Sequence, residues 1–332
     1  MKQSKVQLLV SGYSTPDEPD IELLSLSDQG EFTVSDAHIY GNNPSYLCGD
    51  TEKFYACDEL EPLAGVAAFE IKNDKITFLY ANAFPGSLAC HISSLADSLM
   101  ISNYGDGTIT EIEKATGEIL HTLCLLEDPR KETRAHCSVV NPENTFLYTA
   151  NLGQDAIFIF PIRNGRPQFK ERSIFHLPDG EGPRQVLFDV ERNCCYILCE
   201  LGAKIHVCTC DEKTGALTLC HSYRTTHSTV KCQTGGAALL PDGTVFIANR
   251  GPNTITVFRP LPDAALEFQY ETDCGGNWPR HLCAIPEQNR ILVANQNSGT
   301  ITCFNILQDS LSFCSETPLH GASFVMALPD SQ

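Results

Sequence analysis

The sequence predicts an all-β protein in which seven four-stranded sheets close into a ring, a seven-bladed β-propeller. The first observation is a short apolar run, most legible at residues 245–251, that stops at a polar residue and recurs along the chain. The second is its regular spacing, and the third is an inner strand that is missing at one end of the chain and left over at the other. The last residues of these runs serve as register marks: Gly12, Asp58, Asn103, Asn151, Glu200, Asn249 and Asn295.

Successive register marks are 45 to 49 residues apart, which is the period of a repeat architecture. Each mark is preceded by an inner run, such as residues 184–188 or 280–284, and by a turn such as Pro241-Asp242-Gly243. A third, alternating strand follows the mark, as at residues 254–258, and a more polar fourth strand, as at residues 266–270, completes the unit. Four short strands in a period of about 40 to 50 residues are typical of a propeller blade.

The two ends of the chain are expected to share the seventh blade. Residues 8–12 have the pattern of a second strand with no first strand before them. Residues 322–328 match an inner strand, and Pro329-Asp330 matches the turn that follows one. Pairing the two segments closes the ring and removes the open edges that a row of sheets would expose. We therefore predict a single domain over residues 1–332.

Composition and charge argue against several classes of function. The apolar content of 42% is ample for a core, and the net charge of −18 disfavours nucleic acid and anionic membranes as partners. No run approaches the 18 apolar residues of a membrane span, and residues 1–5 lead straight into a strand rather than a signal peptide. Sixteen cysteines without a Cys-x-x-Cys pair are expected to be buried thiols, not zinc ligands or disulfides. A cytoplasmic protein is predicted.

The unusual polar residues fall at positions that a propeller brings together in one central funnel. Six residues before the turn position of three blades stand His136, Arg184 and Arg280, and the equivalent position of a fourth blade is Gly235, which is expected to leave room. Further polar residues stand at or just after the marks: Asp58, Glu59, Tyr104, Asn151, Glu200, Asn249, Arg250 and Gln296. Several arginines in a confined part of an acidic chain indicate a small anionic ligand.

Two interpretations of the central charged residues are open from their positions alone. Glu200 can act as a base and His136 can carry a proton, with Arg184 and Arg250 holding the ligand. Alternatively, the two arginines and Glu200 form an internal salt-bridge network that joins blades. Trp278, the single tryptophan, either stacks on a ligand or anchors a loop.

The remaining histidines are assigned by their place in the repeat. His91 and His281 begin inner strands, where they can face the channel or pack as structural residues. His206, His221 and His227 are expected in or after outer strands, and their spacing is not that of metal ligands.

Short segments spread in order over nearly the whole chain carry a resemblance to known proteins. They are Arg134-Ala135-His136-Cys137, Gly182-Pro183-Arg184, Cys199-Glu200-Leu201, Ala248-Asn249-Arg250-Gly251, Trp278-Pro279-Arg280-His281 and Ala294-Asn295-Gln296-Asn297. As a series at blade spacing, they resemble the seven-bladed propeller lactonases. This family includes the cycloisomerase-type 6-phosphogluconolactonases and the carboxy-muconate cyclases.

The resemblance implies hydrolysis of a sugar lactone, most directly of 6-phosphogluconolactone to 6-phosphogluconate in the oxidative pentose phosphate route, without an obligatory cofactor. The active site proposed for the muconate cyclase branch has one His, two Arg and one Glu, which match His136, Arg184, Glu200 and Arg250 here. The family often has His-x-His where this chain has Arg134 before His136, and Pro-Arg-His where Gln185 follows Arg184.

For lactone opening we expect Glu200 to activate water, Arg184 and Arg250 to hold the substrate and stabilise the oxyanion, and His136 to protonate the departing ring oxygen. Contacts with a small anionic lactone are expected from Arg134, Asn151, Asn249, Arg280, His281 and Gln296. Two rival functions remain: a muconate-type lactonising cycloisomerase at the same site, and a non-catalytic propeller that binds a partner. The chain lacks the Trp-Asp blade endings of WD-repeat rings.

Overall fold

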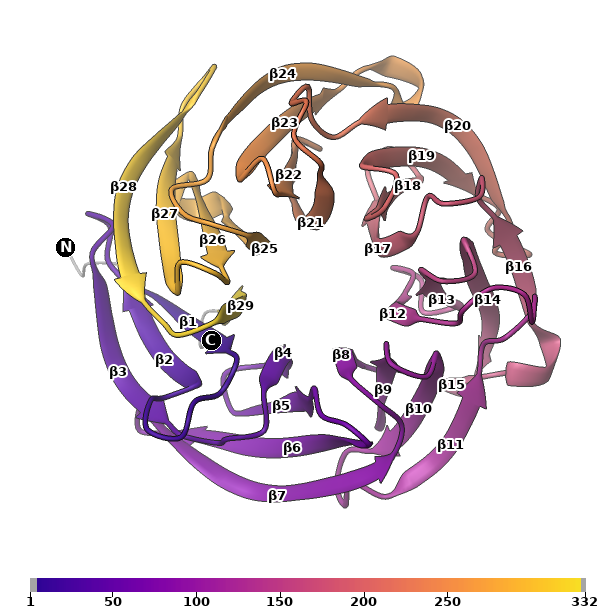
Figure 1. Ribbon diagram of the computed structural model, residues 1–332, viewed down its shortest axis with the longest axis horizontal. Coiled ribbons are helices and arrows are strands. Elements are labelled where there is room, and N and C mark those ends of the chain that lie inside the picture. The colour runs from indigo at the N-terminus through magenta and orange to yellow at the C-terminus, as the bar shows by residue number, and fades with distance from the viewer. Residues whose placement is uncertain (1–4, 330–332) are drawn as a thin grey trace.

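Seven β-sheets surround a central axis in the computed structural model, which describes residues 5–329 (Figure 1). This arrangement confirms the predicted seven-bladed propeller. The recurring apolar runs are the second strands: residues 146–151 coincide with β13 (Phe146–Asn151), whereas Glu200 lies just past the end of β18 (Cys194–Cys199). Asp330, part of the turn expected at the C-terminal end, lies outside the described residues.

Six blades are each built from consecutive strands, in chain order from the axis outward. Two of them comprise β4 (Pro44–Gly49), β5 (Lys53–Asp58), β6 (Leu63–Lys72) and β7 (Lys75–Pro85), then β8 (Ala89–Ser94), β9 (Ser98–Asn103), β10 (Thr108–Glu113) and β11 (Ile119–Cys124). The next two comprise β12 (Ala135–Val140), β13, β14 (Ala156–Arg163), β15 (Arg166–Pro167) and β16 (Ser173–His176), then β17 (Pro183–Asp189), β18, β19 (Lys204–Cys210) and β20 (Leu217–Arg224). The last two comprise β21 (Gln233–Leu239), β22 (Val245–Arg250), β23 (Thr254–Pro260) and β24 (Leu266–Asp273), then β25 (Pro279–Ile285), β26 (Arg290–Asn295), β27 (Thr300–Ile306) and β28 (Leu311–Pro318).

The seventh blade joins the two ends of the chain, as predicted. Its strand order is β29 (Ala322–Ala327), β1 (Val6–Gly12), β2 (Ile21–Leu26) and β3 (Phe32–His38). β29 pairs antiparallel with β1, with Leu8 opposite Ala327 and Ser11 opposite Phe324. In Figure 1 the yellow strand β29 lies beside the indigo strand β1.

The apolar core lies between neighbouring blades rather than within any one sheet. Tyr196 and Val207 of one blade, for example, pack in one cluster with Ile247 and Phe258 of the next. The second and third strands are buried on both faces by such clusters, and they read as near-continuous apolar runs for that reason. Ten of the sixteen cysteines are fully buried, whereas Cys124 and Cys220 are exposed.

Each inner strand carries a β-bulge close to its start, which the repeat pattern did not reveal. In β17, for instance, Pro183 pairs with Cys199 and Gln185 with Leu198, so that Arg184 is left out of the ladder. A bulge bends its strand and re-aims the side chain of the extra residue. The bulged residues form a ring around the axis: Ser45, Cys90, His136, Arg184, Gly235, Arg280 and Ser323.

One blade departs from the four-strand pattern. Its outermost strand is divided into β15 and β16, with the 3-10 helix η1 (Phe169–Glu171) between them. Gly165 has a positive φ of 73°, and Pro167 lacks a backbone N–H, so a continuous ladder cannot form here. Two further 3-10 turns, η2 (Pro262–Ala264) and η3 (Pro286–Gln288), begin with proline. Over residues 5–329, no helix is long and apolar enough to cross a membrane.

Removal of β29 tests the closure of the ring. A chain that ends before Gly321 loses the inner strand of the seventh blade, exposes the edge of β1, and uncovers the cluster that contains Leu8, Val10 and Val325. We expect gross loss of folded protein, measured by soluble yield and by thermal melting. A chain that ends after Pro329 is the matched control, and a monomeric chain without β29 that melts like this control would contradict the expectation.

Candidate active site

A buried carboxylate held by two guanidinium groups lies at the centre of the funnel. Glu200 Oε2 accepts from Arg184 Nη1 at 2.8 Å and pairs with Arg250 Nη2 at 2.7 Å, and each of the three side chains is less than 10% exposed. The arginines come from different blades, Arg184 from the bulge of β17 and Arg250 from the end of β22. Residues 66 positions apart in the chain are thus brought to one carboxylate oxygen.

Backbone carbonyl groups fix the directions of both arginines. Arg184 Nε donates to the carbonyl of Gly235 at 3.1 Å, and Arg250 donates to the carbonyls of Gln233 and Thr234 at 3.2 and 3.0 Å. All of these acceptors belong to the first residues of β21, whose glycine bulge brings the backbone close to the guanidinium groups. The two guanidinium groups are therefore held by the scaffold as well as by Glu200.

His136 joins the cluster through Arg184. Its Nε2 lies in short contact with Arg184 Nη1, which is a donor, so His136 accepts and carries its hydrogen on the other nitrogen. Burial, reinforced by the positive charges of Arg184, Arg280 and Arg250, holds the pKa of His136 well below its usual value of 6.5. His136 is consequently a neutral imidazole at physiological pH.

Burial and the neighbouring charges have opposite effects on the pKa of Glu200. Burial alone would raise the pKa of Glu200, but the adjacent Arg184 and Arg250 outweigh it and leave that pKa below its usual value. Burial, together with the neighbouring charge of Arg184, lowers the pKa of Arg250 to about 10. Glu200 is therefore a carboxylate and both arginines are cations at neutral pH, which gives the three groups a net charge of +1.

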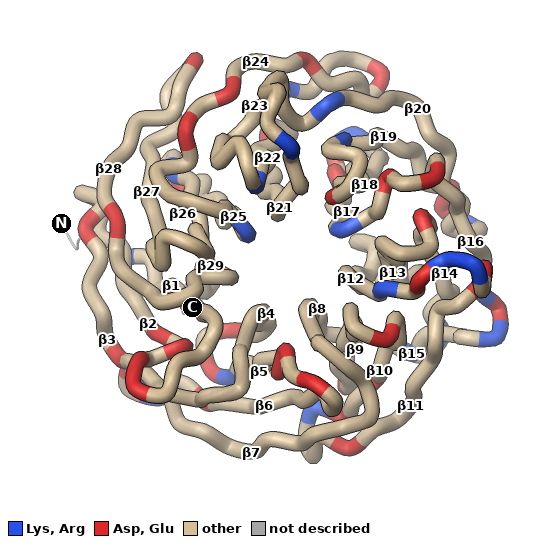
Figure 2. Tube along the Cα trace, viewed as in Figure 1, with Lys and Arg blue, Asp and Glu red and all other residues tan. Residues whose placement is uncertain are grey.

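A small pocket opens next to this cluster at the axis of the ring, with about 260 Å³ of empty space when its open mouth is included. Arg184, Arg280 and His136 line it from the ring of bulged residues. The residues that follow the bulges supply the remainder of its lining: Tyr46, His91, Cys137, Gln185, Gly236 and His281. Figure 2 shows basic segments bordering the axis at β17 and β25, while acidic segments lie mostly along the outer strands and loops. The pocket thus presents two cations and neutral imidazoles inside an acidic protein.

Arg280 belongs to a second charged group across the pocket. Its Nη2 is 3.2 Å from Glu59 Oε2, which also accepts a hydrogen bond of 2.8 Å from Tyr13. The Arg280 guanidinium carbon lies 5.3 Å from the centre of the Tyr13 ring. His281, the next residue, packs against Tyr46 and Phe324, and its Nδ1 is buried without a hydrogen-bond partner. Arg280 and His281 therefore face the pocket, as expected.

Arg134 and Trp278, two other residues predicted in the funnel, pack around the cluster. Arg134 pairs with Glu132 at 2.5 Å and lies over the Tyr104 ring, whose edge meets His136. Trp278, in a left-handed conformation with φ of 65°, lies 5.5 Å from the guanidinium carbon of Arg250. The tryptophan ring thus packs against a charged residue of the cluster.

Gln296 follows register mark Asn295 as Arg250 follows Asn249. Its backbone N–H donates to the carbonyl of Trp278 at 3.1 Å, while its side-chain Oε1 is buried without a hydrogen-bond partner. The structure does not place Gln296 in the lining of the 260 Å³ pocket.

Asn151 and Asn249, from which substrate contacts were expected, do not line the pocket at the axis. Both are fully buried, and the Asn249 amide donates to Thr254 and Thr256 at 3.2 and 2.9 Å. Asn151 donates to the Leu125 carbonyl at 3.0 Å and accepts from the backbone of Arg134 at 2.9 Å. These asparagines fasten the ends of second strands to adjoining segments, so their amides are not available to a ligand.

Gly235 does not leave open space either. A Cβ atom on this residue would lie 2.4 Å from the carbonyl oxygen of Pro279 in the next blade. The glycine is needed for the close approach of two blades, because the neighbouring backbone already occupies the space that a side chain would fill.

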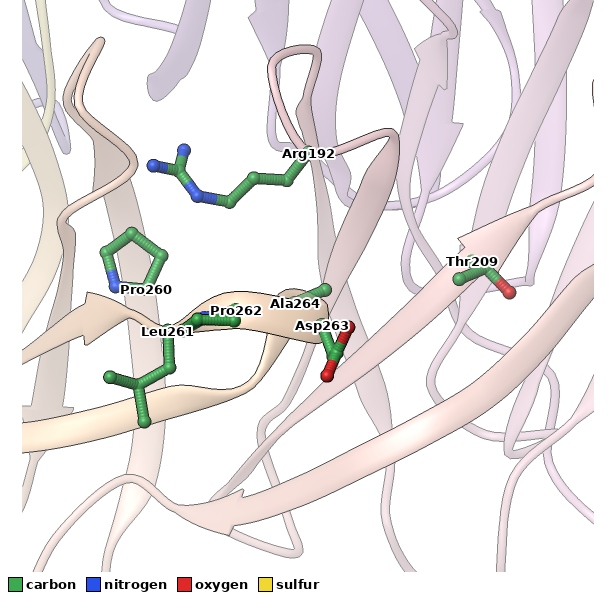
Figure 3. A pocket seen from close by; sticks show the side chains of 7 residues that line it. All are labelled: Arg192, Thr209, Pro260, Leu261, Pro262, Asp263 and Ala264. Atoms are coloured by element: carbon green, nitrogen blue, oxygen red, sulfur yellow. The ribbon is translucent and has the colours of Figure 1, made fainter.

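A larger, open hollow of about 1050 Å³ lies at the outer part of the ring (Figure 3). Its charged members are Arg192 and Asp263, and its remaining walls are small or apolar. Arg192 already pairs with Asp189 at 3.1 Å and donates to the carbonyl of Asp242 at 2.6 Å. No residue of this hollow belongs to the Glu200 cluster, so the pocket at the axis is the better candidate for chemistry.

Tyr13, Tyr46 and Cys90 are funnel residues that the sequence reasoning missed. A signal for Tyr46 was present, because it occupies the same place after its bulge as His281 does in another blade. Extending the count along each inner strand by one residue would have found the lining of the pocket. A signal for Tyr13 was present too, because it directly follows the register mark Gly12, as Glu59 follows Asp58 and Arg250 follows Asn249.

Comparison with known protein families agrees with the propeller fold and with this arrangement of charged residues. The family described as "Lactonase, 7-bladed beta-propeller" matches residues 7–319. The chain therefore belongs to the seven-bladed β-propeller lactonase family, and it is a lactone-hydrolysing enzyme.

The chain is also similar to individual known proteins and solved structures. The 6-phosphogluconolactonase of Bacillus subtilis is 23% identical over 280 residues, which cover 79% of this chain and 80% of the relative. A periplasmic gluconolactonase of Pseudomonas aeruginosa superimposes with a TM-score of 0.87 at 20% identity, covering 98% of this chain and 99% of its own. A protein from Lactobacillus plantarum gives a TM-score of 0.89 at 22% identity, covering 98% and 100%. At such identities, the structural likenesses establish the fold.

The balance of charge in the Glu200 cluster predicts an asymmetry in stability. Glu200→Gln leaves two buried guanidinium groups without their carboxylate and should destabilise the protein by about 3–5 kcal/mol. Arg184→Met leaves a one-to-one pair between Arg250 and Glu200 and should cost less. Chemical denaturation of both variants measures the difference, and equal stability of Glu200→Gln and wild type would show that the carboxylate does not hold the arginines.

Proposed function

We propose that the protein hydrolyses an anionic sugar lactone, 6-phosphogluconolactone, to 6-phosphogluconate. The observation that carries this proposal is the buried Glu200 carboxylate, held at 2.8 and 2.7 Å by Arg184 and Arg250 next to the axial pocket. Membership of the lactonase family supports the reaction. The excess of guanidinium groups over carboxylates in the cluster supports an anionic substrate, because guanidinium groups bind phosphate and carboxylate with paired hydrogen bonds.

Substrate binding should activate the carboxylate. A phosphate group brings a charge of about −1.5 to −2 into a site whose three central groups sum to +1. As Arg184 and Arg250 turn some of their N–H groups toward the substrate, Glu200 loses part of the stabilisation that lowers its pKa. Its pKa then rises, and the carboxylate becomes a stronger base when a substrate is present. Arg280, on the opposite wall, is proposed to contact the anionic group, with Arg134 nearer the rim.

The proposed reaction needs one proton to be taken up and returned. Water attacks the lactone carbonyl carbon while Glu200 accepts a proton from that water, and the N–H groups of Arg184 stabilise the negative oxygen that forms. When the intermediate collapses, the bond between the carbonyl carbon and the ring oxygen breaks. The protonated Glu200 then gives its proton to the ring oxygen. The products are the open-chain acid and its new hydroxyl group, and no covalent bond to the enzyme is formed.

For His136 we propose a different role from the proton donor expected from the sequence. A proton donor must be protonated before the step in which it acts, and the low pKa of His136 leaves it neutral. Its Nε2 instead accepts from Arg184, which also contacts Glu200. We therefore propose that His136 orients Arg184, and that Glu200 alone transfers the proton.

The proposed setting is the oxidative pentose phosphate route in the cytoplasm. Sixteen free cysteines, two of them exposed, suit a reducing compartment.

The first test is hydrolysis of freshly generated 6-phosphogluconolactone, measured against its spontaneous opening. Wild type should accelerate the reaction, Glu200→Gln should lower kcat by about 10²- to 10⁴-fold, and Arg250→Ala by about 10²- to 10³-fold. Arg163→Ala, which removes an exposed arginine paired with Glu171, is the matched control and should retain full activity. Absence of acceleration by wild type, or equal activity in all variants, would overturn the proposed substrate or the proposed site.

The pH dependence separates Glu200 from an ordinary histidine base. The pKa of Glu200 is depressed, so its carboxylate form is present above that pKa and is lost only as the pH falls through it. His136 stays neutral over the same range. We therefore expect kcat/KM, corrected for spontaneous opening and for the second ionisation of the substrate phosphate at about pH 6, to stay level from about pH 8 down to about pH 5. A decline centred near the usual histidine value of 6.5 would contradict this assignment.

A further inference from the structure

A second group of chemically reactive side chains lies outside the lining of the axial pocket and includes the residue before Glu200 in the chain. Cys199 ends β18, His206 lies in β19, and Glu181 lies in the loop before β17. One thiol sulfur, one imidazole nitrogen and one carboxylate oxygen of these residues lie within 4.8 Å of one another. Their exposed fractions are 0%, 1% and 5%. His206 is on the third strand of its blade rather than in or after the outermost one, which is why its spacing in the sequence gave no indication of these neighbours.

Two atoms of this group lack the partners that buried polar atoms normally have. Glu181 Oε2 and His206 Nε2 are buried without a hydrogen-bond partner, and they face each other at 3.4 Å. The other polar atom of each side chain is engaged. His206 Nδ1 is 2.7 Å from Ser222 Oγ, and Glu181 Oε1 accepts from Lys204 Nζ at 2.5 Å. With its hydrogen on Nδ1, His206 directs a lone pair at the carboxylate oxygen, and a cation between the two atoms would satisfy both.

The donor types and the distance between Glu181 and His206 fit zinc. Zinc binds sulfur at about 2.3 Å and nitrogen or oxygen at about 2.0–2.2 Å, so the edges of its tetrahedron measure about 3.3–3.8 Å. The 3.4 Å between Glu181 Oε2 and His206 Nε2 already equals such an edge. A thiolate, an imidazole and a carboxylate together match the borderline-soft character of this ion. We propose that Cys199, His206 and Glu181 bind one zinc ion, with water as the fourth ligand.

Surrounding residues hold the ligands as the outer partners of a metal site do. Asp155 accepts from the backbone N–H groups of Gly180 and Gly182 at 3.1 and 2.8 Å, which fixes the loop that carries Glu181. Gly202 must lack a side chain here, because a Cβ atom would lie 2.2 Å from Glu181 Oε2. Lys204 offsets part of the negative charge that a thiolate and a carboxylate bring to the site.

The ion would act as a structural tie rather than in the reaction. Cys199 immediately precedes Glu200, whose backbone N–H donates to the carbonyl of Gly182, next to Glu181, at 2.8 Å. Cys199 packs in the apolar cluster between its own blade and the preceding one, whereas Glu200 pairs with Arg250 of the following blade, so the zinc would lie apart from the Glu200 cluster. It would fasten the loop before β17 to β18 and β19 and so stabilise the folded chain. This proposal does not depend on the proposed lactone substrate.

Metal titration of chelator-treated, reduced full-length protein tests the site. We expect one equivalent of zinc to bind and to raise the melting temperature as its concentration increases. Cobalt(II), used as a spectroscopic probe, should give the thiolate charge-transfer band of a cysteine ligand. Cys199→Ala should lose both the band and the zinc-dependent rise in melting temperature.

Cys195→Ala is the matched control, because Cys195 is a fully buried thiol in the same strand and the same apolar cluster. It should bind one zinc ion as wild type does. If Cys199→Ala fails to fold, Glu181→Gln, which preserves the size of the side chain, should show the same loss of zinc-dependent stabilisation. Absence of stoichiometric binding by wild type would overturn the proposal, and so would equal binding by Cys199→Ala or loss of binding in Cys195→Ala alone.

Discussion

Closure of the ring by the pairing of β29 with β1 is the constraint on which the rest of the structure depends. Each blade buries apolar side chains on both faces of its second and third strands, and a closed ring gives every face a neighbouring sheet. The same pairing places Phe324 of β29 against Tyr46 and His281, which line the pocket at the axis. The stability of the fold and the shape of the site therefore have one origin.

The bulge in each inner strand places a side chain at the axis of the ring, where the candidate site lies. Three of the bulged residues are large and polar, namely His136, Arg184 and Arg280, and the other four are small. Bulged residues also connect blades: Ser323 donates to the carbonyl of Ser45 at 3.0 Å, and Arg184 donates to that of Gly235 at 3.1 Å. The bulges thus connect neighbouring blades and also direct charged side chains toward the axis. They explain how distant parts of the chain converge on Glu200.

The structure also reconciles the two interpretations of the charged cluster. Arg184, Glu200 and Arg250 do form an internal salt-bridge network between blades, because the arginines come from neighbouring sheets. That network has more positive than negative groups, and it borders a pocket. A balanced network would need no ligand, whereas this one carries a net positive charge that the proposed anionic substrate would offset. The same contacts therefore stabilise the fold when no substrate is bound and, in the proposed mechanism, take part in catalysis when a substrate is bound.

The architecture and the principal members of the cluster could be predicted from the amino-acid pattern alone. A period of 45 to 49 residues, alternating strands and a strand divided between the two chain ends specify the propeller, since these patterns reflect local burial. Counting within that period also predicted His136, Arg184 and Arg280 as equivalent positions, because equivalent residues of a repeat share a radial position. Only the tertiary structure decided which polar groups are engaged. The amide of Asn151 donates to the carbonyl of Leu125, 26 residues earlier, and the low pKa of His136 results from its burial and from the charges of arginines on other blades. Both depend on contacts between residues far apart in the chain, and such contacts leave no periodic signal in the sequence.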